Sequence, residues 1–189
     1  MEPGLESKIE LRRQARMRRD LIPAKEREAA GRRILEHLCA LPDYPAVDKI
    51  FMYCGFGSEP DTLAWAERFR KDGKITAFPR TYPGGRMIYA RADEDSQLVP
   101  GRFGIPEPDA SCEVLEPGPG DWVLVPALLF DRDGYRIGYG SGCFDRYLAD
   151  YPDCRTIGAT FEIARSAVPL PREATDIPVG LFVTEKEEL

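Results

Sequence analysis

Hydrophobic residues recur along the chain with the two periods that distinguish helices from strands. In segment 59–73, Leu63, Ala66 and Phe69 have the spacing of one helix face, and Gly73 marks its end. This segment lies between two short apolar runs, 48–55 and 74–79, which indicate buried strands. A strand, a helix and a strand in this order predict a parallel sheet with a right-handed crossover.

The rest of the chain also shows the patterns of helices and strands. An N-terminal helix is predicted at about 7–21, with Ser7 as its N-cap, and a second helix begins near Pro23. Segment 121–130 is apolar almost throughout, which predicts one strand at the centre of the sheet. Other segments are expected as strands (86–92, 155–160, 179–185), a helix (143–150) and mostly ordered loop (93–120).

These elements predict an α/β fold over residues 1–189. We expect a single three-layer domain with a mainly parallel central sheet flanked by helices, preceded by an N-terminal helical segment. The length suffices for one domain with a substantial core. The pattern shows no internal repeat and no low-complexity linker.

Composition excludes several classes of protein. The net charge of −6 disfavours a general nucleic-acid binder, and apolar runs such as 123–130 are too short to span a bilayer. The N-terminus lacks the apolar core of a signal peptide, so we expect a cytoplasmic monomer without nucleic-acid or membrane partners. Five cysteines without a CxxC pair argue against a disulfide framework and a structural zinc site. His37 is the single histidine and is expected at the surface or at its boundary with the core, so histidine-dependent catalytic triads and metal sites built from histidine clusters are excluded.

The glycine-rich segment 138–142, "GYGSG", carries the first candidate chemistry. We expect it to follow the central strand after a turn at 131–134 and to lead directly into the helix at 143–150. Bare backbone amides beside a helix N-terminus suit a polyphosphate, although many such segments are only tight turns. The spacing matches neither a P-loop nor G-x-G-x-x-G. Asp145, three residues later, suits Mg²⁺, or alternatively a helix cap or an ion pair with Arg146.

The glycine segment contains no lysine or arginine, so positive charge to bind a phosphate must come from elsewhere in the chain. Lys8 and Arg12 are four residues apart on the first helix, and Arg16 extends the same stripe. Charges on one helix face can hold adjacent phosphates. The alternative for most of this basic segment is a solvated helix face.

A second candidate site follows the first predicted strand, in "SEPDT" at 58–62. Glu59 lies at the carboxyl edge of the expected sheet, where its carboxylate would accept hydrogen bonds from the N–H groups of a heterocycle. The alternative for Asp61 or Thr62 is the role of helix cap. Aromatic residues near this edge would provide a stacking surface, with core packing as the better alternative for each: Tyr53, Phe56 and Phe103.

With these segments in place, the chain resembles the 5-formyltetrahydrofolate cyclo-ligase (5,10-methenyltetrahydrofolate synthetase) family over nearly its whole length. The most specific block, "VLVPALLFDRDGYRIGYGSGCFDRYLAD", resembles V-P-x-x-x-F-D-x-x-G-x-R-[LI]-G-x-G-x-G-[YF]-[YF]-D-R. It is in register with "SKIELRRQAR", "SEPDT", "FPR" at 78–80, Met87 and "GIPEP" at 104–108. The resemblance implies an enzyme that uses Mg-ATP to convert 5-formyltetrahydrofolate to 5,10-methenyltetrahydrofolate, with release of ADP and phosphate.

The resemblance also implies roles for individual residues. Lys8 and Arg12 are expected to act on the ATP phosphates as catalytic residues, and two carboxylates, Asp145 and Asp176, to hold Mg²⁺. The expected ATP-binding residues are Lys8, Ile9, Glu10, Leu11, Arg12, Arg136, Gly138, Tyr139, Gly140, Ser141, Gly142, Cys143 and Phe144. The expected substrate-binding residues are Cys54, Glu59, Met87, Phe103, Tyr139, Gly140, Ser141, Gly142 and Cys143.

The sequence departs from the usual family pattern at several positions. Cys143 stands at the first of two positions that are usually aromatic, and Phe144 stands at the second, where a frequent tyrosine hydroxyl is therefore absent. Ser141 stands where Gly or Lys is common, and Thr175 and Gly180 replace a His and a second late Asp. These departures motivate an alternative, a paralogue that binds ATP but acts on another substrate or binds folate without turnover. A nucleic-acid-binding module built on the basic helix is a third reading, opposed by the acidic remainder of the chain.

Overall fold

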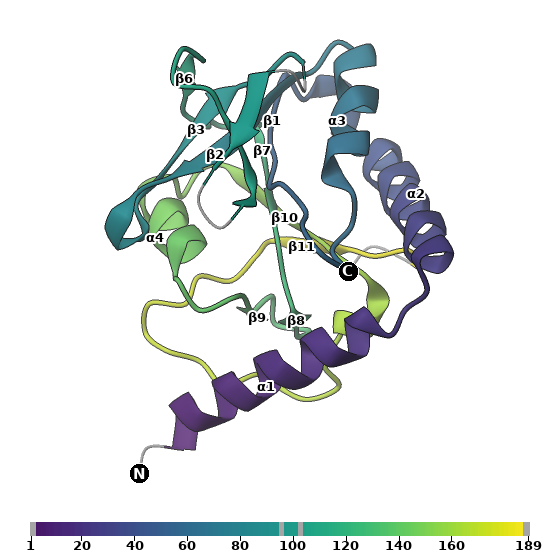
Figure 1. Cartoon of the computed structure of the whole chain (residues 1–189), viewed down its shortest axis with the longest axis vertical. Coiled ribbons are helices and arrows are strands. Elements are labelled where there is room, and N and C mark those ends of the chain that lie inside the picture. The colour runs from purple at the N-terminus through teal and green to yellow at the C-terminus, as the bar shows by residue number, and fades with distance from the viewer. Residues whose placement is uncertain (1–2, 95–96, 102–103, 187–189) are drawn as a thin grey trace.

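Seven strands form one mixed sheet in the order β11-β10-β7-β1-β2-β3-β6 (Figure 1). The computed structural model describes the backbone of residues 3–94, 97–101 and 104–186, with side chains from Lys8 onward. The strands of this sheet are β1 (Lys49–Phe51), β2 (Ile75–Thr81), β3 (Met87–Arg91), β6 (Val114–Leu115), β7 (Trp122–Val125), β10 (Arg155–Ala159) and β11 (Leu181–Val183). The strands from β11 to β2 are parallel, which confirms the predicted sheet; β3 is antiparallel to β2, and β6 to β3.

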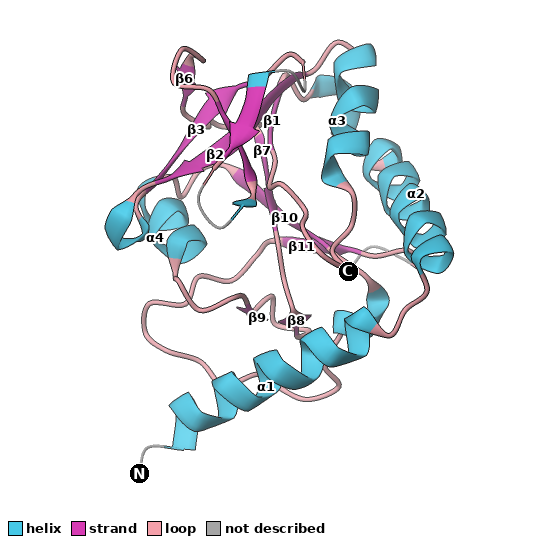
Figure 2. Cartoon of the chain, viewed as in Figure 1, coloured by secondary structure: helices cyan, strands magenta, loops and turns pink. Residues whose placement is uncertain are grey.

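Helices cover both faces of this sheet (Figure 2). Helices α2 (Ala24–Ala40) and α3 (Thr62–Lys71) lie on one face, and α4 (Cys143–Asp150) lies on the other. Side chains alternate along a strand, so β7 contributes to both layers. Leu124 belongs to the same apolar cluster as Ile34 of α2, whereas Val123 belongs to the cluster of Leu148 on α4. The predicted three-layer arrangement is therefore confirmed.

Helix α1 (Pro3–Asp20) lies apart from the sheet, across a hairpin of β8 (Leu129–Phe130) and β9 (Arg136–Ile137) (Figure 1). Leu11 and Ala15 pack against this hairpin in a small apolar cluster of their own. The helix begins before Ser7, so the predicted N-cap at Ser7 is wrong. Among the described residues no helix has the length and apolar content needed to cross a membrane.

The apolar segment 121–130 forms two strands, and the prediction of one central strand is wrong. Strand β7 ends at Val125 because Pro126 has no backbone N–H to donate to a ladder, and β8 begins only at Leu129 in a separate two-stranded sheet. The glycine segment consequently follows the β8–β9 hairpin rather than the central strand β7. Segment 93–120, predicted mostly as loop, contributes short strands: β4 (Leu98–Pro100), β5 (Pro106–Pro108) and β6.

The remaining irregular elements are short 3₁₀ helices, which the structure describes at Tyr44–Ala46, Pro83–Gly85 and Glu162–Ala164. His37 is half-buried on α2, with Nδ1 2.8 Å from the Thr184 carbonyl oxygen. This agrees with the boundary position predicted for it. The described residues contain no disulfide, as the cysteine spacing predicted.

Candidate active site

A cavity of about 1170 Å³ opens at the carboxyl ends of the central strands. Its walls include Tyr53 and Cys54 after β1, Thr81 at the end of β2, and Pro126 after β7. From β1 the chain continues to β2 on one side and later returns to β7 on the other, so the order of the strands reverses here. Open α/β sheets bind ligands at such a switch point, because the loops diverge and leave a crevice.

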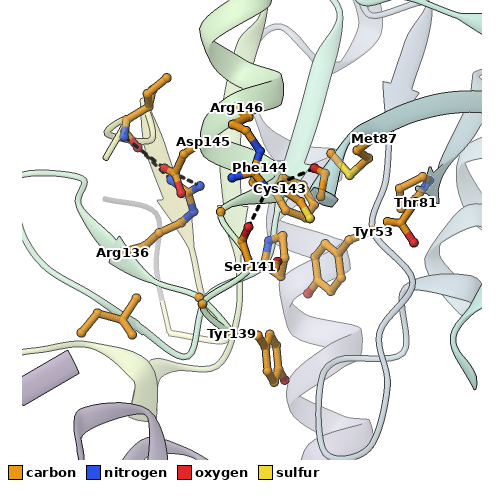
Figure 3. Close-up of a pocket in the computed structure, with 18 of the residues that line it drawn as sticks. Tyr53, Thr81, Met87, Arg136, Tyr139, Ser141, Cys143, Phe144, Asp145 and Arg146 are labelled. Atoms are coloured by element: carbon orange, nitrogen blue, oxygen red, sulfur yellow. Dashed lines mark hydrogen bonds and ion pairs between the residues drawn. The ribbon is translucent and has the colours of Figure 1, made fainter. Parts of the chain in front are cut away.

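Most of the sequence-predicted site residues line this one cavity, although they come from segments far apart in the chain. Figure 3 shows Arg136 and Asp145 on one side, Tyr53, Thr81 and Met87 on the other, and the glycine segment between them. The predicted residues that line the cavity are Lys8, Arg12, Cys54, Glu59, Met87, Arg136, Gly138, Tyr139, Gly140, Ser141, Gly142, Cys143, Phe144, Asp145 and Asp176. Phe103 lies outside the described residues.

Three predicted ATP-binding residues do not reach the cavity: Ile9, Glu10 and Leu11. A helix turns by about 100° per residue, so positions four or seven apart on α1 face nearly the same way, whereas the residues directly after Lys8 point elsewhere. Lys8, Arg12 and Arg16 share that face. Ile9 is 60% exposed, the Glu10 carboxylate binds Arg13 on the solvent side, and Leu11 packs against the β8–β9 hairpin.

Two glycines of the segment 138–142 have conformations that disfavour any side chain. Gly140 has φ of +99°, and an added Cβ would lie 3.2 Å from Cζ of Arg12. Gly142, the N-cap of α4, has φ of +64°, and its Cβ would lie 3.0 Å from Nη1 of Arg146. Gly138 differs, because its φ is not positive and a Cβ there would meet nothing within 4 Å. The first glycine thus faces open cavity, and the other two fit the backbone against arginines.

Arg12 lies beside the glycine segment, and Lys8, one helical turn earlier, lines the same cavity next to Asp176 and Glu173. Nε of Arg12 donates a 2.9 Å hydrogen bond to the Gly138 carbonyl oxygen. Lys8 is 5% exposed, and its ammonium is 2.8 Å from the Asp176 carboxylate and 3.0 Å from that of Glu173. Burial lowers the Lys8 pKa, but the two carboxylates outweigh that effect and raise it overall. Lys8 is therefore a cation at any physiological pH.

Asp145 pairs with neither of the groups that the sequence offered as alternatives. Its Oδ1 accepts from Arg136 Nη2 at 3.0 Å and from the Ile177 amide at 3.1 Å, so the predicted ion pair with Arg146 and the role of helix cap are both wrong. Arg146 instead donates to the carbonyl oxygens of Ser141 and Gly85. Burial lowers the pKa of Arg136, although Asp145 opposes this effect.

The chemistry of Asp145 and Asp176 fits Mg²⁺. The amide of Ile177, next to Asp176, binds Asp145, so the two acids approach one wall of the cavity. Each uses a single oxygen in the hydrogen bonds above, Oδ1 of Asp145 and Oδ2 of Asp176, leaving the second as a hard ligand. Magnesium characteristically takes one or two carboxylates and completes its shell with phosphate oxygens and water. The described residues hold no group of three or more His, Cys, Asp or Glu side chains that could hold a metal ion, so phosphate oxygens or water would complete the shell of such an ion.

Glu59 lies near the glycine segment at another part of the cavity wall, with its side chain 3% exposed. Its Oε1 accepts from the Tyr139 hydroxyl at 2.9 Å and lies 3.5 Å from Arg19 Nη1, while Oε2 accepts from the Phe56 amide at 3.2 Å. Burial raises the Glu59 pKa despite the opposing effect of Arg19 and of these hydrogen bonds. Asp61 is the helix cap of α3, so Glu59 does not have that role. Glu59 lines the cavity instead.

The aromatic residues near Glu59 divide between the core and the cavity. Tyr53 is 3% exposed and donates to the Ala159 carbonyl oxygen, so it is a core residue whose edge reaches the cavity. Phe56 is 37% exposed and its ring lies 4.9 Å from that of Tyr139. The prediction of core packing is therefore wrong for Phe56.

The sequence analysis gave no individual role to several residues that build this site. Arg19 is 5% exposed, so the alternative of a solvated helix face does not hold for this residue of the basic segment. Glu107 lines the cavity and accepts from the Thr81 hydroxyl at 2.5 Å; its position within "GIPEP" was the only available indication. Glu173 holds Lys8, and no feature of the sequence pointed to it.

Comparison with known proteins identifies the family to which this geometry corresponds. Residues 5–185 match the model of the 5-formyltetrahydrofolate cyclo-ligase family. The 5-formyltetrahydrofolate cyclo-ligase of Escherichia coli (strain K12) is 26% identical over 174 residues, which cover 89% of this chain and 95% of the relative. That of Mus musculus is 29% identical over 145 residues, or 73% and 71% of the two chains.

A solved structure agrees with this match. The 5,10-methenyltetrahydrofolate synthetase of Aquifex aeolicus superimposes with a TM-score of 0.84 at 31% identity and covers 96% of this chain and 91% of that chain. The agreement extends over the helical N-terminus and the mixed sheet together.

Proposed function

Because the chain belongs to the 5-formyltetrahydrofolate cyclo-ligase family, we propose that its cavity binds ATP and 5-formyltetrahydrofolate side by side and closes the folate ring there. The reaction is the ATP-dependent conversion of 5-formyltetrahydrofolate to 5,10-methenyltetrahydrofolate. One observation carries the assignment of the site: Lys8, Glu59, Gly138 and Asp145, from three segments far apart in the chain, line one cavity at the switch point of the sheet.

The end of the cavity near Lys8 and Arg12 is suited to the triphosphate. Lys8 and Arg12 supply fixed positive charge, Arg136 adds a third cation, and the backbone at Gly138 is open to close approach. In phosphoryl transfer the protein contributes mainly positioning and neutralisation of charge, so cations and amides suffice and no histidine is required. Lys8 exchanges its bond with Asp176 for one with a phosphate when the nucleotide binds.

Asp145 and Asp176 are the residues that would hold Mg²⁺. When bound, the ion would neutralise phosphate charge, which supplements what the lysine and arginines provide. Arg136 keeps the Asp145 carboxylate oriented toward the cavity through their 3.0 Å contact. Family membership supports the use of ATP, and the donor set supports the metal.

The end of the cavity near Glu59 is suited to the pterin ring. The carboxylate would accept hydrogen bonds from pterin N–H groups and hold N5 and N10 in line for closure. The formyl oxygen on N5 takes the γ-phosphoryl group from ATP and ADP leaves. N10 then attacks the activated formyl carbon and loses its proton to solvent. The bond between that carbon and the phosphate oxygen breaks, and inorganic phosphate leaves. Phe56 and Met87 provide apolar surface against the folate rings.

The experiment that tests this function follows methenyltetrahydrofolate absorbance with 5-formyltetrahydrofolate, with and without Mg-ATP. We expect product only when ATP is present, with one ADP per product. Well-folded protein that gives no product would refute the assignment. If such protein still binds Mg-ATP, the alternative of a paralogue with another substrate is favoured, for which the Cys143–Phe144 pair is the motivating feature.

A further inference from the structure

Behind the cavity wall, one arginine contacts both side chains proposed to meet the pterin. We propose that Arg19 is a positioning residue that holds the Glu59 carboxylate and the Tyr139 hydroxyl in place for the substrate. The inference rests on the proposed function, because it takes Glu59 to be a ligand of the pterin. Arg19 itself is not among the residues that line the cavity, so it acts through the two that are.

Each nitrogen of the Arg19 guanidinium has its own acceptor. Nε donates to the Ser58 hydroxyl at 2.9 Å, Nη2 donates to the Tyr139 hydroxyl oxygen at 2.7 Å, and Nη1 lies 3.5 Å from Glu59 Oε1. Tyr139 then has its own proton available and donates it to Glu59 at 2.9 Å. The planar fork of an arginine can make these three contacts in fixed directions, whereas the ammonium of a lysine cannot.

Burial makes the charge of Arg19 as important as its shape. The side chains of Arg19 and Glu59 are 6% and 3% exposed, so water solvates neither charge. Among the described residues, the ionisable groups that interact with Glu59 are Arg19 from α1, Tyr139 from the glycine segment and Tyr53 after β1. Arg19 is the cation of this set. Without it, burial would favour the protonated carboxyl, which offers one acceptor fewer to a pterin.

The position of Arg19 on α1 links the two ends of the cavity. Lys8, Arg12 and Arg19 are spaced by four and seven residues, which returns each to nearly the same face of the helix. A rise of 1.5 Å per residue separates Lys8 from Arg19 by about 16 Å along the axis. One helix therefore brings a cation to the proposed nucleotide end and supports the proposed pterin end.

The test compares Arg19→Met with wild-type protein in two equilibrium titrations, one with 5-formyltetrahydrofolate and one with ATP, each from mildly acidic to mildly alkaline pH. The lost charge-assisted bonds predict a folate Kd at least about tenfold higher in the variant, with ATP affinity within about threefold of wild type. Because the carboxyl of Glu59 is then protonated up to a higher pH, the decline in folate affinity on acidification should begin at a higher pH than in wild type.

Three further proteins make the outcome decisive. Arg18→Met, an exposed arginine on the same helix, is the matched control and should behave as wild type. In a Glu59→Gln background, Arg19→Met should have little further effect on folate binding. Arg19→Lys keeps the charge but not the fork, so it should raise the folate Kd without moving the pH midpoint; it also decides the matter if Arg19→Met does not fold.

The proposal would be overturned by any of three results: equal losses of ATP and folate affinity, an unchanged pH midpoint in Arg19→Met, or full additivity with Glu59→Gln. These outcomes are distinct from failure of the proposed function, which is recognised by wild-type protein that neither binds 5-formyltetrahydrofolate nor forms the methenyl product.

Discussion

Replacement of Gly138 by alanine separates the folding role of the glycine segment from its proposed binding role. Because φ at Gly138 is not positive and an added Cβ would meet no atom within 4 Å, the methyl group occupies open cavity. Alanine also restricts the unfolded chain, which favours folding by about 0.4–1 kcal/mol where the conformation is compatible. Gly138→Ala should therefore be at least as stable as wild type.

The same methyl group stands where the triphosphate is proposed to approach the main chain. If it prevents one charge-assisted hydrogen bond to a phosphate, the loss of binding free energy is about 1.5–3 kcal/mol. Each 1.4 kcal/mol is about a factor of ten, so the Kd for ATP should rise at least about tenfold. The affinity for 5-formyltetrahydrofolate, whose proposed contacts are at Glu59, should change less.

The assay pairs calorimetric titration of ATP with thermal unfolding. Gly118→Ala is the matched control, because Gly118 also has no positive φ and lies outside the cavity; both measurements should match wild type. Gly140→Ala provides the contrast, since φ of +99° and the nearby Arg12 side chain predict a stability loss of roughly 1–3 kcal/mol. An unchanged ATP affinity in Gly138→Ala would refute the idea that bare backbone here serves the phosphate.

Other substitutions address the remaining parts of the site. Lys8→Ala should raise the KM for ATP at least tenfold and change the KM for the folate little, because only the phosphate loses a charge-assisted partner. Steady-state kinetics measures both constants. An equal change in the two would show that Lys8 serves neither substrate specifically. Glu59→Gln should do the reverse, and it should also remove a pH effect: burial raises the Glu59 pKa, so wild-type folate affinity falls on acidification through a pKa above the usual value of 4.5, whereas a glutamine does not titrate. Asp145→Asn should raise the Mg²⁺ concentration needed for half-maximal rate about tenfold, with exposed Asp150→Asn as control; an unaltered Mg²⁺ dependence would exclude Asp145 as a ligand.

Local patterns predicted the elements that depend on local interactions. The apolar spacing of Leu63, Ala66 and Phe69 was sufficient for α3, since a helix satisfies its own backbone and needs only one apolar face. The β1–α3–β2 order was sufficient for parallel pairing, because the handedness and length of the crossover leave few alternatives. Segment 121–130 was different: its apolar content is the same on both sides of Pro126, but its two halves belong to different sheets.

The sequence by itself determined the fold class and, through motifs that resemble a known family, many of the residues that line the cavity. It did not determine how those residues are paired. That Lys8 binds Asp176 and Glu173, that Asp145 binds Arg136 rather than Arg146, and that Arg19 is buried against Glu59 are outcomes of tertiary packing. The physical reason is that basic residues on a helix have the same spacing in the sequence whether their side chains face water or a buried carboxylate. Only the position of α1 across the β8–β9 hairpin decides between the two.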